Sequence, residues 1–140
     1  MITSEKKYTI LIVEDEVSLR NALCDKFTRD GFFVFNAKDG EVGLITALRE
    51  KPHIILLDII MPKMDGITML KKLRLENEWS KNVPVVLLTN IGADDEKMIK
   101  EIREDKSVCY LVKSNWAIKD MVEKVREMLS RSALSNNLIS

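Results

Sequence analysis

Five short apolar runs alternate along the chain with longer segments of mixed polarity. These runs occupy residues 8–13, 32–35, 53–57, 83–88 and 108–112. Short runs rich in β-branched residues, without polar alternation, are typical of strands that are covered on both faces. Because strands that alternate with helices form parallel sheets, the pattern predicts a doubly wound α/β fold with helices on both faces of the sheet.

The segments between the runs predict five helices, since their apolar residues recur at helical spacing. In chain order, the expected helices contain Leu19, Leu23 and Phe27; residues 42–48; Leu70 and Leu73; Met98, Ile99 and Ile102; and the apolar residues of 118–129. Pro52 is expected to end the second helix, and Asp65 to cap the third. The acidic residues 94–96 are expected at the N-terminus of the fourth, where negative charge is favourable.

Length and charge restrict the possible functions. A chain of 140 residues has room for one domain of ordinary size. We expect this domain to span residues 7–130, followed by a flexible C-terminal tail at residues 131–140. The 22 basic and 22 acidic residues give no net charge, so a general basic field for nucleic acid or membranes is not expected. With no apolar stretch of membrane length, we expect a cytoplasmic protein.

Cysteine and histidine are too few for a metal site of their own. Cys24 and Cys109 lie far apart in the sequence, and His53 is the only histidine. A site with His and Cys ligands therefore cannot be assembled from this chain. Both cysteines are expected to be buried, reduced thiols.

Polar side chains follow four of the predicted strands at their carboxyl ends. Glu14 and Asp15 follow the first run, Asp58 the third, Thr89 the fourth and Lys113 the fifth. These ends meet at one edge of an open α/β sheet, where ligands bind. Clustered carboxylates repel one another without a cation, and an all-oxygen cluster suits Mg²⁺. One carboxylate could act as nucleophile toward a phosphoryl group, with Lys113 and Thr89 as partners for its oxygens.

These motifs resemble the receiver domain of bacterial response regulators, over about residues 7–130. Residues 58–66, Asp-Ile-Ile-Met-Pro-Lys-Met-Asp-Gly, are similar to the family's stretch of phosphoacceptor Asp, Met-Pro and Asp-Gly. The other matching motifs are Val13-Glu14-Asp15, Leu88-Thr89 and Tyr110-Leu111-Val112-Lys113. The resemblance implies a flavodoxin-like sheet of five parallel strands in the order 2-1-3-4-5, flanked by five helices.

The resemblance also implies a role for each motif residue. Asp58 would be the phosphorylation site, and Thr89 and Lys113 would contact the phosphoryl oxygens. Tyr110 would be the aromatic switch residue, which moves inward when Thr89 is drawn to the phosphate. The implied ligands of Mg²⁺ are Asp15, Asp58, the backbone carbonyl of Ile60 and, through water, Glu14.

The partners implied upstream are a sensor histidine kinase or a histidine phosphotransfer protein. Downstream, a protein target would bind the face formed by the fourth helix, the fifth strand and the last helix. The chain would assist its own phosphorylation and dephosphorylation without turning over an external substrate. Because few residues follow position 131, we expect a single-domain regulator that signals through protein–protein contacts.

Several positions depart from the family's usual pattern. Ser114 stands where proline usually follows the lysine, which predicts a trans peptide bond. We expect Ser114 and Asn115 to cap the last helix, with Lys113 still reaching the site. The apolar Ile60 and Ile91 near the acceptor predict slow self-dephosphorylation, because they give an attacking water no orienting partner.

Three other interpretations remain open at this point. A pseudo-receiver would keep the fold as an interaction module without phosphorylation. A phosphatase of the dehalogenase type would need an Asp-x-Asp motif after the first strand, where this chain has Glu14-Asp15. A flavin-binding protein would need a phosphate-cradling loop of Ser, Thr and Gly at the same place.

Overall fold

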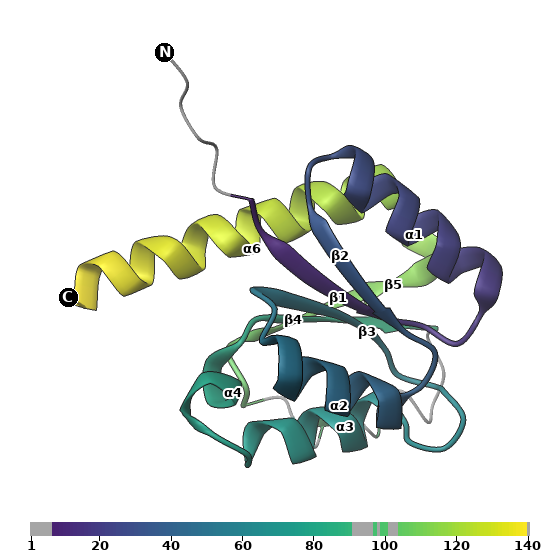
Figure 1. Cartoon of the computed structure of the whole chain (residues 1–140), viewed down its shortest axis with the longest axis horizontal. Helices are drawn as coiled ribbons and strands as arrows, with labels where there is room; N and C mark the ends of the chain where they lie inside the picture. Colours follow the sequence, from purple (N-terminus) through teal and green to yellow (C-terminus); the bar gives the residue numbers. More distant parts are fainter. Residues whose placement is uncertain (1–6, 91–96, 98, 101–103, 140) are drawn as a thin grey trace.

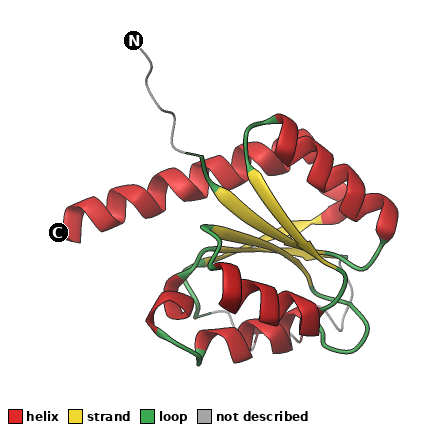
Figure 2. Ribbon diagram, viewed as in Figure 1, coloured by secondary structure: helices red, strands yellow, loops and turns green. Residues whose placement is uncertain are grey.

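A single parallel sheet forms the centre of the protein (Figures 1 and 2). The computed structural model describes residues 7–90, 97, 99–100 and 104–139. Its strands are β1 (Thr9–Val13), β2 (Phe33–Ala37), β3 (Ile54–Asp58), β4 (Val85–Thr89) and β5 (Val108–Val112). The order is β2-β1-β3-β4-β5, and all four neighbouring pairs are parallel. This is the flavodoxin-like, doubly wound order that the resemblance implied.

Helices cover both faces of the sheet (Figure 1). They are α1 (Val17–Arg29), α2 (Gly40–Glu50), α3 (Gly66–Arg74), α4 (Glu78–Asn82) and α6 (Ile118–Ile139), with a 3-10 turn η1 (Lys113–Asn115) before the last. α1 and α6 lie on one face, and α2, α3 and α4 on the other. No helix within the described part of the chain is both long enough and apolar enough to cross a membrane.

β3 and β4 are buried at every residue, as the continuous apolar runs predict. Their side chains alternate between two apolar cores, one on each face of the sheet. Leu57 of β3 packs into the core under α2 and α3, whereas Leu56 packs into the core under α1 and α6. Because both faces are filled, the ends of the strands are where polar side chains can be placed.

Side-chain caps fix the starts of α2 and α3 near the carboxyl ends of the strands, whereas Glu16 before α1 makes no such cap. The Asp39 carboxylate accepts a hydrogen bond from Val42 N–H at 2.9 Å, and Asp65 accepts one from Thr68 N–H at 2.8 Å. The prediction of Asp65 as an N-cap is therefore confirmed. Each cap also sets where the preceding loop leaves the sheet edge.

Several boundaries differ from the expected ones. The one-turn helix α4 was not predicted; a capping box formed by Asn77 and Ser80 stabilises it. It delays β4 until after Pro84, which has no N–H to give to a ladder. α6 continues to Ile139, so the segment expected as a tail is helical; its flexibility stays a prediction.

The helix predicted around Met98, Ile99 and Ile102 lies largely outside the described residues. Residues 97, 99 and 100 are helical, while Met98 and Ile102 are not described. The acidic residues 94–96 and Ile91 also lie outside the described part of the chain, so the predictions made for them stay predictions.

Candidate functional site

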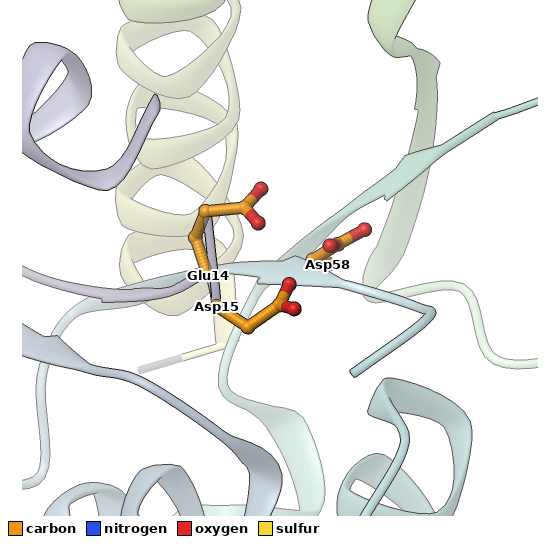
Figure 3. A group of neighbouring side chains, drawn as sticks. All are labelled: Glu14, Asp15 and Asp58. Carbon is orange, nitrogen blue, oxygen red and sulfur yellow. The ribbon is translucent and has the colours of Figure 1, made fainter. Parts of the chain in front are cut away.

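Three carboxylates meet where β1 and β3 end side by side (Figure 3). Val13 of β1 pairs with Leu57 of β3, so Glu14 and Asp58 follow at the same level of the sheet. One carboxylate oxygen from each of Glu14, Asp15 and Asp58 lies within 4.8 Å of the other two. The parallel register of two adjacent strands thus brings together residues that are 44 positions apart.

The three carboxylates differ in exposure. Glu14 and Asp58 are 1% and 3% exposed, whereas Asp15 is open to solvent. Burial in a medium of low polarity disfavours the charged form of a carboxyl group. A buried carboxylate is costly unless a cation lies beside it, so these two side chains need a positively charged partner.

Lys113 supplies one cation from the end of β5. Its Nζ lies 3.0 Å from Glu14 Oε1 and 3.1 Å from Asp58 Oδ2. Burial lowers the pKa of Lys113, but the hydrogen bond to Glu14 and the charge of Asp58 outweigh this effect and leave the pKa raised. Lys113 is thus held as a permanent ammonium ion between the two buried carboxylates.

One ammonium ion does not balance three carboxylates. Burial, which is the larger cause, and the negative charge of Glu14 together raise the pKa of Asp58 to about 7, although Lys113 opposes the rise. Near neutral pH the Asp58 carboxyl group is therefore poised between its neutral and charged forms. Any added cation would favour the charged, nucleophilic form.

The donor set fits a hard divalent cation. All three groups are carboxylates, two from consecutive residues and one from the neighbouring strand, and neither cysteine belongs to the cluster. Mg²⁺ binds through one or two carboxylates together with waters and phosphate oxygens. The residues present therefore fit a Mg²⁺ site.

The sequence analysis missed the hydrogen bonds by which Arg20 holds the turn at Glu14 and Asp15. Arg20 of α1 donates from Nη1 to the carbonyl oxygens of Glu14 at 2.9 Å and Asp15 at 3.4 Å. Glu16 N–H donates to Glu14 Oε2 at 3.1 Å. These bonds fix the turn that carries two of the carboxylates. Arg20 bonds to backbone oxygens, so no residue pattern in the turn itself signals it.

Gly66 is a second positioning residue, which the sequence analysis treated only as part of a turn. A Cβ at this position would lie 2.2 Å from the carbonyl oxygen of Asp58. Gly66 N–H also donates to the Ile59 carbonyl at 2.7 Å. Only glycine allows α3 to begin so close to the end of β3.

Thr89, Ile60 and Tyr110 occupy the predicted places around this edge. Thr89 is the last residue of β4 and is 4% exposed; it comes directly after Leu88, the pairing partner of Asp58. Ile60 follows β3 in the loop and is 50% exposed. Tyr110 is half-buried in β5 and packs on the core under α2 and α3. Its role as a switch stays a prediction.

The segment after Lys113 differs in part from the expectation. The described residues contain no cis peptide bond, so the trans bond before Ser114 is confirmed. Ser114 and Asn115 form the 3-10 turn η1 and do not cap α6, which begins only at Ile118. The capping prediction was wrong because two residues without regular structure, Trp116 and Ala117, separate the turn from the helix. Lys113 nevertheless reaches the site.

Comparison with known proteins identifies close likenesses. The family model of the response regulator receiver domain matches residues 10–126. Sporulation initiation phosphotransferase F of Bacillus subtilis is 35% identical over 104 residues, which cover 74% of this chain and 80% of that protein. A probable transcriptional regulator ycf27 of Guillardia theta is 33% identical over 132 residues, covering 94% of this chain and 49% of that protein.

Solved structures give the same result. The receiver domain of the Francisella response regulator 1452 has a TM-score of 0.77 and 26% identity, and the match covers 90% of this chain and 99% of that one. Among the curated relatives, several regulators are matched over only about half of their length.

Proposed function

This chain belongs to the response regulator receiver family, and from that premise we propose that Asp58 accepts a phosphoryl group from a phosphohistidine. The donor would be a sensor histidine kinase or a histidine phosphotransfer protein. The observation that carries the proposal is the buried carboxylate of Asp58 beside Lys113 and two further carboxylates. A phosphotransferase among the relatives, matched over most of its length, supports the same chemistry.

In the transfer, an oxygen of the Asp58 carboxylate attacks phosphorus. A P–O bond forms, the P–N bond to the donor imidazole breaks, and the imidazole takes up a proton from solvent. Later attack by water on phosphorus returns inorganic phosphate and the free carboxylate. Asp58 must be ionised to act as nucleophile, and its pKa of about 7 leaves this form accessible at neutral pH.

Asp15 and Asp58, the Ile60 carbonyl and, through water, Glu14 would hold Mg²⁺. When bound, Mg²⁺ would supply positive charge to the site and to the incoming phosphoryl oxygens. Lys113 is already paired with the acceptor at 3.1 Å and would follow the added negative charge onto the phosphoryl group. Arg20 holds the Glu14-Asp15 turn in place through the two carbonyl oxygens of that turn.

The readout would pass through Thr89 and Tyr110. The Thr89 side chain would move toward the phosphoryl group, so that its hydroxyl hydrogen-bonds a phosphoryl oxygen. The space that Thr89 leaves would let the Tyr110 ring turn inward. Both residues lie on the last two strands: Thr89 is one residue beyond the level of Asp58, and Tyr110 is one residue before it. We propose that a downstream protein binds the face formed by β5, α6 and the helix predicted around Met98, Ile99 and Ile102, and that a change at Tyr110 alters this face.

The regulator would act in the cytoplasm and would not turn over an external substrate. The chain spans about half the length of several curated relatives, whose names describe transcriptional regulators. We propose that this chain signals through protein–protein contacts. Within the described site no feature favours a pseudo-receiver, because the acceptor, the lysine and the acidic turn are all present and close together.

The test is to incubate the protein with Mg²⁺ and acetyl phosphate and to measure the intact mass. We expect a gain of one phosphoryl group, absent without Mg²⁺ and absent in Asp58→Asn. Asp25→Asn is the matched control, since Asp25 is an exposed carboxylate on α1. No gain in the wild-type protein, or an equal gain in Asp58→Asn, would refute the proposal.

A further inference from the structure

β2 is an outer strand of the described sheet and is mostly apolar. β2 lies at one end of the sheet order, and no strand in the described part of the chain pairs with its outer side (Figure 1). Its sequence, Phe-Val-Phe-Asn-Ala, contains no charged residue and no proline. Charges and prolines are the usual means by which edge strands avoid pairing with another chain.

Two aromatic side chains stand together at this edge. Phe33 and Phe35 lie on the same side of the strand, with ring centroids 5.3 Å apart. Phe33 is 52% exposed and Phe35 is partly exposed, whereas Phe32 just before them is buried. Exposed aromatic pairs are costly in water and are common at contact surfaces.

Along β2, residues that bond to β1 alternate with residues whose backbone groups point to the outer edge of the sheet. Phe33 N–H donates to the Tyr8 carbonyl at 2.9 Å, and the Ala37 carbonyl accepts from Glu14 N–H at 3.1 Å. Because direction alternates along a strand, residues 33, 35 and 37 bond to β1. Val34 and Asn36 therefore direct their N–H and C=O groups outward.

We infer that two copies of this chain associate through β2, antiparallel, about a two-fold axis at Phe35. In this register Val34 of each copy lies opposite Asn36 of the other, which pairs all four outward groups of each strand. Phe35 then faces Phe35 of the second copy, and Phe33 lies beside its Ala37. Aromatic cross-strand pairs of this kind stabilise sheets. The result is one continuous ten-stranded sheet.

The alternative symmetric arrangement fails on its hydrogen bonds. With parallel strands, a two-fold axis places each residue opposite the same residue of the other copy. In a parallel ladder, however, a residue whose N–H and C=O point toward the partner strand lies opposite a residue whose groups point away. Charge does not oppose the antiparallel arrangement: the chain has no net charge, and in this register the exposed Lys38 of one copy lies opposite the apolar Phe32 of the other. Asp30, two residues from Phe32, is paired with Lys26 within its own chain.

Backbone pairing can be tested by sedimentation over a range of protein concentrations. We expect the mass to rise from the 16.1 kDa of one chain toward twice that value. Asn36→Pro should weaken dimerisation roughly tenfold or more, since each dimer loses two N–H donors, whereas Asn36→Ala keeps the N–H and should have little effect. Thermal unfolding of each variant shows that it is folded. A monomer at all concentrations, or a dimer equally stable in Asn36→Pro, would overturn the inference.

The register can be tested by cross-linking in a background where Cys24 and Cys109 are replaced by serine. Phe35→Cys should form a disulfide-linked dimer when diamide is added as oxidant, because facing residues in such a pair have Cα atoms about 4.5 Å apart. Phe33→Cys is the matched control and should stay monomeric, since its counterpart lies four residues along the strand. Equal cross-linking of both variants, or of neither, would overturn the register.

Discussion

Arg74 and Asp58 both carry charge below the surface, but their surroundings differ. Arg74 donates to Asp105 at 2.8 Å and to the carbonyl oxygens of Ser80 and Val83 at 3.0 and 2.7 Å. One cation there meets one carboxylate and two carbonyl groups. Around Asp58, three carboxylates share the single ammonium of Lys113. The charges of the first cluster balance, although Arg74 Nη2 is buried without a hydrogen-bond partner among the described residues, whereas the second cluster lacks positive charge.

This difference separates a structural ion pair from a reactive site. Arg74 ties α3 to α4, to the residue before Pro84 and to the segment that leads into β5. The Asp58 cluster also links β1, β3 and β5, but its single ammonium ion does not neutralise its three carboxylates. A cluster that lacks positive charge can gain stability from a cation and can accept a change of charge without losing the fold. The predictions below test this contrast.

The largest effect on stability is expected at Arg74, in the cluster whose charges balance. Arg74→Ala should lower the free energy of unfolding by about 3 kcal/mol, because Asp105 and two carbonyl groups lose their donor in a partly buried place. Arg49→Ala is the control; its side chain is 64% exposed and the variant should change stability by less than about 0.5 kcal/mol. Urea unfolding measures both. A loss in Arg74→Ala that disappears when Mg²⁺ is added would contradict the contrast.

A substitution of Asp58 is expected to increase the free energy of unfolding when no metal is present. Its pKa is raised from 3.8 to about 7, so folding favours the protonated form. The stability contributed by this proton is complete below pH 4 and is lost as the pH rises through about 7. Asp58→Asn removes that loss and should raise the free energy of unfolding at pH 8 by about 2 kcal/mol. Urea unfolding from pH 5 to pH 8, in EDTA, measures it; a destabilised Asp58→Asn at pH 8 would contradict the account.

Substitution of Arg20 is expected to lower the affinity for Mg²⁺ at the Asp58 cluster. Arg20→Met removes the clamp on the Glu14 and Asp15 carbonyl oxygens, so the ligands are less well placed. We expect Mg²⁺ affinity to fall roughly tenfold, measured as the shift in unfolding midpoint with Mg²⁺ concentration. Arg29→Met, in the last turn of the same helix, is the control. Unchanged Mg²⁺ affinity in Arg20→Met would show that the turn holds its shape alone.

The smallest effect concerns the lifetime of the phosphorylated state. Ile60 is 50% exposed beside the acceptor and offers an attacking water no hydrogen bond. Ile60→Asn should accelerate loss of the phosphoryl group severalfold, about 1 kcal/mol in the barrier, after the donor is removed. The exposed Leu75, changed to Asn, serves as the control. A wild-type lifetime of seconds, or no acceleration in Ile60→Asn, would contradict the prediction of slow reset.

The fold was largely predictable because β3 and β4 are buried on both faces, and such strands are recognisable as continuous apolar runs. The place of Glu14, Asp15, Asp58 and Lys113 followed from the geometry of parallel sheets, where carboxyl ends share one edge. The identity of each role came from the family resemblance, not from the pattern.

What could not be predicted depends on contacts between backbone and distant side chains. Arg20 bonds to the carbonyl groups of a turn, and Gly66 is required by the carbonyl of Asp58. Neither contact leaves a periodic signal. The short α4 rests on one capping box, and the turn after Lys113 on a local backbone choice, so both escaped an analysis based on apolar spacing.

The central claim is that the carboxylate of Asp58 is the group that becomes phosphorylated. After incubation with Mg²⁺ and acetyl phosphate, borohydride reduction converts an aspartyl phosphate to homoserine, which peptide mass spectrometry can locate. The account predicts homoserine at position 58 alone, dependent on both donor and Mg²⁺. Homoserine at position 15, or none at any position, would contradict it.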